Sequence, residues 1–223
     1  MLDIKDIKIT RSSRRSVAIV IHPDGTVEVR APKLVPQFAI NAFIKSRMEW
    51  IEKKLQLIVK NIPNKKKFQD GEMIVFMGVK YPLSIVTTPH IEVKDGKLLF
   101  PLALASRGKE ALEKWYIKHA KSTIKEQVEY YAKEMGTTYN GITSFTDTRS
   151  KWGSCTHDNR LQFNWRLIMA PPIVLRYVII HELVHTTEKN HSAIFWNKVR
   201  KYNPSYKAQI KWLKENGNGL MLE

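Results

Sequence analysis

Residues 171–192, PPIVLRYVIIHELVHTTEKNHS, carry the strongest structural signal in this chain. Two prolines open the stretch, and proline is tolerated in the first turn of a helix, where the N–H groups have no helical partner. From Ile173 to Val184 the sequence is almost entirely apolar up to a group of polar residues near its end. A helix of this composition must be buried on most sides. We therefore predict a buried helix that carries its polar side chains into the interior.

Those polar side chains are His181, Glu182 and His185, an H-E-x-x-H pattern. Burying them without a partner is costly, so their burial demands compensation. Histidines at i and i+4 lie one turn apart on one helix face, where their ring nitrogens can converge on one Zn²⁺ at about 2.0–2.1 Å. Glu182 lies about 100° around the helix from His181. This spacing favours Glu182 as a catalytic base rather than a ligand.

A third histidine, His191, follows six residues after His185. A continuous helix would carry it about 9 Å along the axis and about 120° away, where it could not share a metal. The chain must therefore turn, and 189–190 is a suitable place because asparagine tolerates left-handed backbone. Ser192 can then cap a following helix. We expect this turn to return His191 to the metal as its third ligand.

Three protein ligands are typical of a catalytic zinc site rather than a structural one. Structural sites are usually closed by four ligands and rich in cysteine, whereas this chain has one cysteine, Cys155, distant from the histidines. The open position predicts a zinc-bound water that attacks an amide carbonyl, with Glu182 taking the proton and returning it to the leaving amine. The candidates for stabilising the oxyanion are Arg149, His157, Arg166 and Tyr177.

The remaining sequence predicts an α+β protein. Two strands within 16–30 meet at a Pro-Asp-Gly turn, an amphipathic basic helix covers 36–60, a linker or solvated loop follows to 70, and four short strands lie within 72–100. A long helix covers 107–135, strands cover 142–148 and 161–167, and three helices end the chain. We predict a β-rich N-terminal region with a helix at 1–106 and a metallopeptidase domain at 107–223. The strand at 161–167 could hold an extended peptide at a sheet edge, or it could be an ordinary core strand, and its alternation favours neither interpretation over the other.

The composition restricts the class of protein and the cellular compartment in which this chemistry would take place. The 223 residues are 43% apolar, which excludes a disordered chain, and no apolar run approaches the roughly 20 residues that cross a bilayer. The N-terminus has no apolar signal segment, and a single cysteine excludes an internal disulfide framework. We therefore expect a cytoplasmic protein without a membrane partner. A net charge of +16, spread along the chain, leaves nucleic-acid binding open.

Several motifs resemble the YgjP-like metallopeptidase family, whose members are predicted metal-dependent hydrolases related to the SprT-like and WLM zinc proteases. The resemblance covers 151–212 and rests on Trp152–Cys155, Asn164–Leu167, Tyr177–His185, Asn190–Ser192 and Phe195–Trp196. It implies a minimal zincin fold with His181, His185 and His191 as zinc ligands and Glu182 as the catalytic base. The SprT-like and WLM relatives act on DNA-bound proteins, which would give the positive charge a role.

The leading hypothesis is thus a zinc-dependent metallopeptidase that acts on a protein or peptide. One alternative is a basic nucleic-acid-associated module with a structural metal, whose DNA affinity would depend steeply on salt and would not need Glu182. Another is a zinc hydrolase of a small amide, which would require a closed pocket instead of an open groove. For Trp152–Cys155 we favour a tight turn with a buried thiol over a cysteine that reversibly blocks the zinc.

Overall fold

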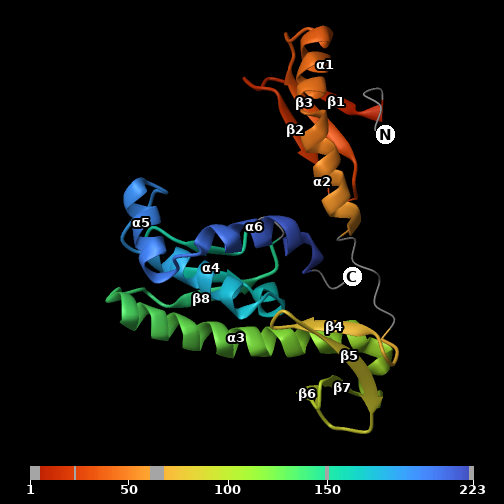
Figure 1. The fold of residues 1–223 in the computed structure, drawn as a ribbon, viewed down its shortest axis with the longest axis vertical. Helices are drawn as coiled ribbons and strands as arrows, with labels where there is room; N and C mark the ends of the chain where they lie inside the picture. Colours follow the sequence, from red (N-terminus) through yellow and green to blue (C-terminus); the bar gives the residue numbers. More distant parts are fainter. Residues whose placement is uncertain (1–5, 23, 61–67, 149–150, 221–223) are drawn as a thin grey trace. The chain divides into compact units, whose positions relative to one another are not determined.

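A computed structural model describes residues 6–22, 24–60, 68–148 and 151–220, with the backbone alone at 58–60. Helices and strands both build the fold, so the predicted α+β class is confirmed (Figure 1). The contacts divide the chain into two compact units, unit 1 at residues 1–62 and unit 2 at residues 63–223.

Unit 1 is a three-stranded sheet with two helices. Its strands β1 (Lys8–Ser12), β2 (Ala18–Ile21) and β3 (Val27–Pro32) lie in the order β1-β3-β2. The predicted hairpin is confirmed as the antiparallel pair β2–β3, while β1 runs parallel to β3. Alternate residues of β3 are buried, as expected for a sheet with one face in the core.

The single helix predicted for 36–60 is wrong in one respect, because two helices form instead. They are α1 (Gln37–Ser46) and α2 (Met48–Lys60), separated at Arg47. The Arg47 N–H bonds to the Ile44 carbonyl, a tight i−3 turn that interrupts the α-helical pattern. Ile40, Ile44 and Ile51 remain fully buried in one cluster, so the break keeps both apolar faces on the same core.

Unit 2 begins with the four strands predicted within 72–100, which are confirmed. They are β4 (Met73–Phe76), β5 (Val79–Val86), β6 (Glu92–Lys94) and β7 (Lys97–Pro101), in the order β4-β5-β7-β6. Their buried side chains Ile74, Leu83, Leu98 and Phe100 belong to the same core as the C-terminal helices. The division therefore falls at residue 62 rather than at the predicted residue 106, because these strands share one core with the helices of the C-terminal half.

The long helix α3 (Gly108–Met135) comes after a short 3₁₀ helix, η2 (Leu102–Arg107). It ends as predicted at Gly136, whose left-handed φ of 60° suits a residue without a Cβ. Buried residues recur every four positions along one face of α3, from Leu112 to Ala132. This face packs against α4 (Pro172–Val184) and against the 3₁₀ helix η3 (Trp165–Met169), as Figure 1 shows for α3 and α4.

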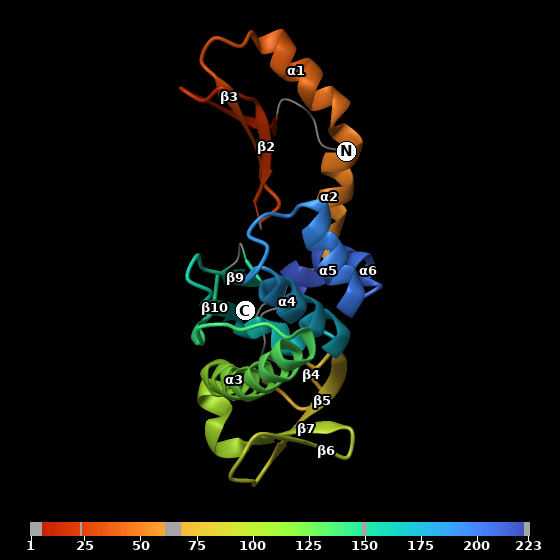
Figure 2. The same ribbon diagram turned by 90° about the vertical axis from the view of Figure 1, so that its left-hand side faces the viewer.

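A second sheet of unit 2 has the strand order β8-β10-β9, formed by β8 (Ile142–Thr146), β9 (Gly153–Cys155) and β10 (Leu161–Asn164). Of the two interpretations of 161–167, the core strand is confirmed and the edge strand is wrong: β10 is the central strand, and the chain turns into η3 at Trp165. The prediction of a tight turn at 152–155 is also wrong, because Gly153–Cys155 forms β9 at the sheet edge. Figure 2 shows β9 beside α4.

The three predicted C-terminal helices are confirmed as α4, α5 (Ala193–Tyr202) and α6 (Tyr206–Asn216), with the 3₁₀ turn η4 (Gly217–Gly219) after them. Nine of the thirteen residues of α4 are buried, as its apolar sequence requires. No helix in the described part of the chain is long and apolar enough to cross a membrane.

The hairpin between β4 and β5 supports the start of α4. At its tip, the N–H groups of Met77 and Gly78 donate to the carbonyls of Ile168 and Met169 in η3. Gly78 has a φ of 78°, and a Cβ there would lie 2.8 Å from the Pro171 Cα. The hairpin tip thus lies directly against the residue that precedes α4.

Replacing Gly78 with alanine is therefore expected to destabilise the protein by about 2–4 kcal/mol, through left-handed backbone strain and overpacking together. Gly71 is a matched control, because its φ is 81° and a Cβ there meets no atom within 4 Å. The Gly71→Ala change should cost about 1–2 kcal/mol from backbone strain alone. Urea unfolding measures both values, and equal costs would contradict close packing of the hairpin against Pro171.

Candidate metal centre

The centre is built at the C-terminal end of α4. His181 and Glu182 lie in the last turn of the helix, and His185 is its C-cap residue. The helix stops at Val184, earlier than the turn predicted at 189–190, and the chain reverses over the next residues. Ser192 then caps α5 by accepting the Phe195 N–H, as predicted. The reversal brings His191 back to the end of α4.

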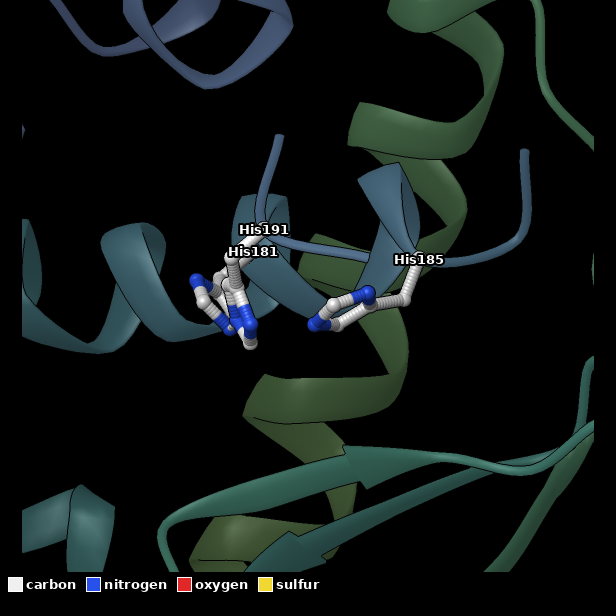
Figure 3. Close-up of side chains that lie close together, drawn as sticks. All are labelled: His181, His185 and His191. Atoms are coloured by element: carbon white, nitrogen blue, oxygen red, sulfur yellow. Dashed lines mark hydrogen bonds between the residues drawn. The ribbon is translucent and has the colours of Figure 1, made fainter. Parts of the chain in front are cut away.

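The three histidines meet at one point (Figure 3). One ligand atom from each of His181, His185 and His191 lies within 4.8 Å of the other two. The Nε2 atoms of His181 and His191 are 3.1 Å apart, near the roughly 3.4 Å expected between two ligands of a tetrahedral zinc ion. Three converging imidazoles are a donor set suited to Zn²⁺ and other first-row divalent ions. The residues present therefore fit the metal that the sequence predicts.

Contacts at the Nδ1 atoms, which face away from the cluster, orient the rings of His185 and His181. His185 Nδ1 lies 2.9 Å from the Glu188 carbonyl oxygen, which can only accept, so Nδ1 carries the proton and Nε2 keeps its lone pair. His181 Nδ1 lies 3.4 Å from the Tyr177 hydroxyl, which leaves its Nε2 directed at His191. Contacts of this kind fix the tautomer and ring direction of metal ligands.

Aromatic side chains of α5 pack around the imidazoles. The Phe195 ring centroid lies 4.9, 4.5 and 4.7 Å from the rings of His181, His185 and His191, and Phe195 is fully buried. The Trp196 ring stacks on His191 at 5.6 Å. Phe195 thus contacts all three imidazole rings. It belongs to α5, and the third histidine, His191, lies just before the start of the same helix.

The electrostatics keep the helical histidines neutral. Burial lowers the pKa of His181 to about 3, with smaller contributions from His185 and His191, and burial also lowers the pKa of His185. Neutral imidazole is the form that binds a metal ion, because the ring nitrogen must offer a lone pair. The site is therefore ready to bind a cation near neutral pH.

Glu182 is buried beside this cluster, with 5% of its surface exposed. Burial raises the pKa of its carboxyl group to about 8, and the charge of Lys151 acts in the opposite direction. A Cβ added to Gly153 in β9 would lie 2.7 Å from both Cγ and Oε1 of Glu182. The carboxyl group therefore lies directly against the backbone of the edge strand, where only glycine leaves room for it.

The family of the chain is settled by a comparison with family models. The model described as YgjP-like, metallopeptidase domain, matches residues 15–216. The chain belongs to the YgjP-like family. The match confirms the resemblance seen in the sequence and extends it from 151–212 to both units. As a YgjP-like protein, the chain is a metal-dependent peptidase by family.

Other comparisons add one solved structure. The YgjP-like chain is similar to the crystal structure of the metallopeptidase zymogen jannalysin of Methanocaldococcus jannaschii, with 23% identity and a TM-score of 0.33. The match covers 40% of this chain and 93% of that chain. A search of the curated proteins gives no match.

The oxyanion candidates lie in different surroundings in this YgjP-like structure. Arg149 lies outside the described residues. Arg166 pairs with Asp147, and the Tyr177 hydroxyl lies near His181 Nδ1, on the side of that ring opposite the cluster. His157 is exposed in the turn between β9 and β10.

The contact between Gly153 and Glu182 was not predicted from the sequence. The Trp-Gly-Ser-Cys motif at 152–155 was the only available signal for it. A glycine in a strand can mark a place where another group approaches the backbone closely, which is its role here.

Proposed function

We propose that this YgjP-like protein hydrolyses peptide bonds with a zinc ion held by His181, His185 and His191 and with Glu182 as the general base. The convergence of the three ring nitrogens within 4.8 Å carries the proposal, because donor set and spacing both suit zinc. When bound, zinc supplies Lewis acidity towards a carbonyl oxygen and a water molecule. Three protein ligands leave room for both.

Glu182 is suited to move the proton. Its burial raises the pKa of the carboxyl group, and a base with a pKa near the working pH can both accept and return a proton. In the proposed reaction, the carboxylate takes one proton from the attacking water and donates it to the nitrogen of the leaving amine. The new C–O bond forms first and gives a tetrahedral oxyanion. The C–N bond then breaks as Glu182 protonates the leaving nitrogen, which regenerates the Glu182 carboxylate.

The edge strand β9 offers a place for an extended substrate. The Trp152 carbonyl accepts the Asn164 N–H of β10, and the Thr156 N–H donates to the Arg160 carbonyl just before β10. Because main-chain groups alternate in direction along an antiparallel strand, Gly153 and Cys155 direct theirs away from β10. A peptide that pairs with this edge would pass Gly153, next to Glu182. Among the described strands β9 pairs only with β10, and its other edge suits an extended peptide better than a small amide.

The test is metal-dependent cleavage. The protein is stripped with a chelator, reloaded with Zn²⁺, and incubated with casein and with fluorogenic peptides, with and without duplex DNA. We expect one zinc per chain by mass spectrometry, cleavage that disappears with the chelator, and recovery on reloading. Cleavage of N-acyl amides but not peptides would favour the small-amide alternative, and salt-sensitive DNA binding without any hydrolysis would favour the nucleic-acid module.

Gly153→Ala tests the position of Glu182. The added methyl group would collide with the Glu182 side chain and displace it, while the three histidines are untouched. Because small misplacements of a catalytic group cost about 10²-fold in rate, we expect kcat to fall by about that factor with zinc content unchanged. Ser154→Ala in the same strand is the control, since Ser154 faces the other way and bonds Gln162. A fully active Gly153→Ala variant would contradict the proposed role of this contact.

A further inference from the structure

Lys151 lies just before β9, two residues from the glycine that contacts Glu182. Gly153 and Cys155 face α4: the first lies against Glu182, and the Cys155 Sγ lies 3.8 Å from Nζ of Lys189, in the loop after α4. Side chains alternate in direction along a strand, and Lys151 continues the set of alternate residues to which Gly153 and Cys155 belong.

The backbone of Lys151 is held firmly although its side chain is exposed. Asn164 of β10 is 2% exposed, and its Nδ2 donates to the Lys151 carbonyl at 3.3 Å and to the Thr148 carbonyl at 2.7 Å. The Asn164 N–H also donates to the Trp152 carbonyl at 2.8 Å. One buried amide thus fixes the backbone from which the Lys151 side chain extends into solvent.

Lys151 is not engaged in a close ion pair with Glu182. Among the described residues, no carboxylate lies within 4.0 Å of the Lys151 ammonium group. Lys189, by contrast, has its ammonium bonded to the Thr156 carbonyl and to Asn159 Oδ1. Lys151 is therefore an exposed cation, two residues from the glycine that contacts Glu182, and it has no carboxylate partner among the described residues.

We propose that Lys151 is a specificity-determining residue that binds a carboxylate of the peptide substrate lying along β9. The inference rests on the proposed function, because it assumes a peptide at this edge. An ammonium group recognises a carboxylate through charge-assisted hydrogen bonds, and an exposed one needs little desolvation to do so. A C-terminal carboxylate and an acidic side chain share this chemistry, and the experiment separates them.

Binding is measured in the Glu182→Gln background, loaded with zinc, so that bound peptides stay intact. Three labelled peptides share one sequence: a C-terminal acid with neutral side chains, its C-terminal amide, and the amide with one Gln changed to Glu near the bond cleaved by the wild type. We expect one of the two carboxylate-bearing peptides to bind about tenfold tighter than the neutral amide. The Lys151→Met change should reduce this difference to below twofold, and Lys151→Arg should preserve most of it.

Lys94→Met is the matched control, because Lys94 is an exposed lysine of unit 2 in β6, away from α4 (Figure 1). It should keep the tenfold difference. The inference would be overturned if the Glu182→Gln protein with Lys151 intact bound all three peptides equally. It would also be overturned if Lys151→Met weakened the binding of all three peptides by the same factor. Hydrolysis by the wild type is measured separately, so a carboxylate preference without any cleavage would contradict the proposed function and leave the recognition by Lys151 supported.

Discussion

Glu182→Gln is expected to lower kcat for peptide hydrolysis by about 10²–10⁴-fold while the zinc content stays at one per chain. Glutamine has nearly the same shape as glutamate, so it fits the space beside Gly153, but its amide cannot accept the proton of the attacking water. The side chain is not one of the three converging ligands, so the metal should remain. Steady-state cleavage of a fluorogenic peptide, combined with mass-spectrometric metal analysis of the same sample, measures both quantities.

Glu134→Gln is the control for this change, because Glu134 is an exposed glutamate on α3. It should retain wild-type kcat. If Glu182→Gln loses its zinc, Glu182 supports the metal site rather than proton transfer. If it keeps full activity, Glu182 is not the base.

His185→Ala is expected to weaken zinc binding by more than about 100-fold and to abolish peptide cleavage. Loss of an outer contact alone costs about 10–100-fold in metal affinity, and this change removes a ligand itself. It also leaves a gap beside Phe195, whose ring lies 4.5 Å from that of His185. Competition with a chromophoric chelator gives the zinc affinity, and mass spectrometry gives the metal content after gel filtration.

His90→Ala is the matched control, since His90 is an exposed histidine of unit 2 outside the cluster. It should bind zinc as the wild type does. One zinc per chain in purified His185→Ala would contradict the three-histidine site, whereas metal loss confined to His185→Ala would support it. Circular dichroism of the zinc-free wild type and the variant shows whether the change acts on the metal or on the fold.

The convergence of the three histidines could be predicted from the sequence because its information is local. His181 and His185 are fixed by helical spacing, and the apolar run around them demands a buried helix. His191 required only one further inference, that the chain reverses, and the cap at Ser192 marked the start of the next helix. The exact end of α4 was less accessible, because no glycine or proline comes directly after Val184.

The sheet edge beside the cluster could not be predicted, because it depends on pairing between distant segments. Gly153–Cys155 is three residues long and has no apolar alternation, so nothing in it indicates a strand until β10 is placed. The alternation within 161–167 predicted a strand but not its central position, which results from partners on both sides. Strand order and edge identity are properties of the assembled sheet.

The boundary between the two units could not be predicted from the sequence either. Both β-rich segments, at 8–32 and 73–101, have similar alternating patterns, and the sequence does not say which core each one joins. Ile74, Leu83, Leu98 and Phe100 pack with the C-terminal helices, whereas Val29 and Ile40 form a separate cluster. The resemblance in the sequence covered only 151–212, although the family spans both units.

Because Phe195 of α5 packs against all three imidazoles, metal binding by these histidines would be linked to the packing of α5 on α4. A cation held by His191 would fasten the segment just before α5 onto the end of α4, in addition to the apolar contacts of the helix. Filling the proposed site would then strengthen the tertiary structure, and loosening of α5 would release the ion. Resistance to heat and to digestion would therefore rise and fall with the supply of the metal in the surroundings of the protein.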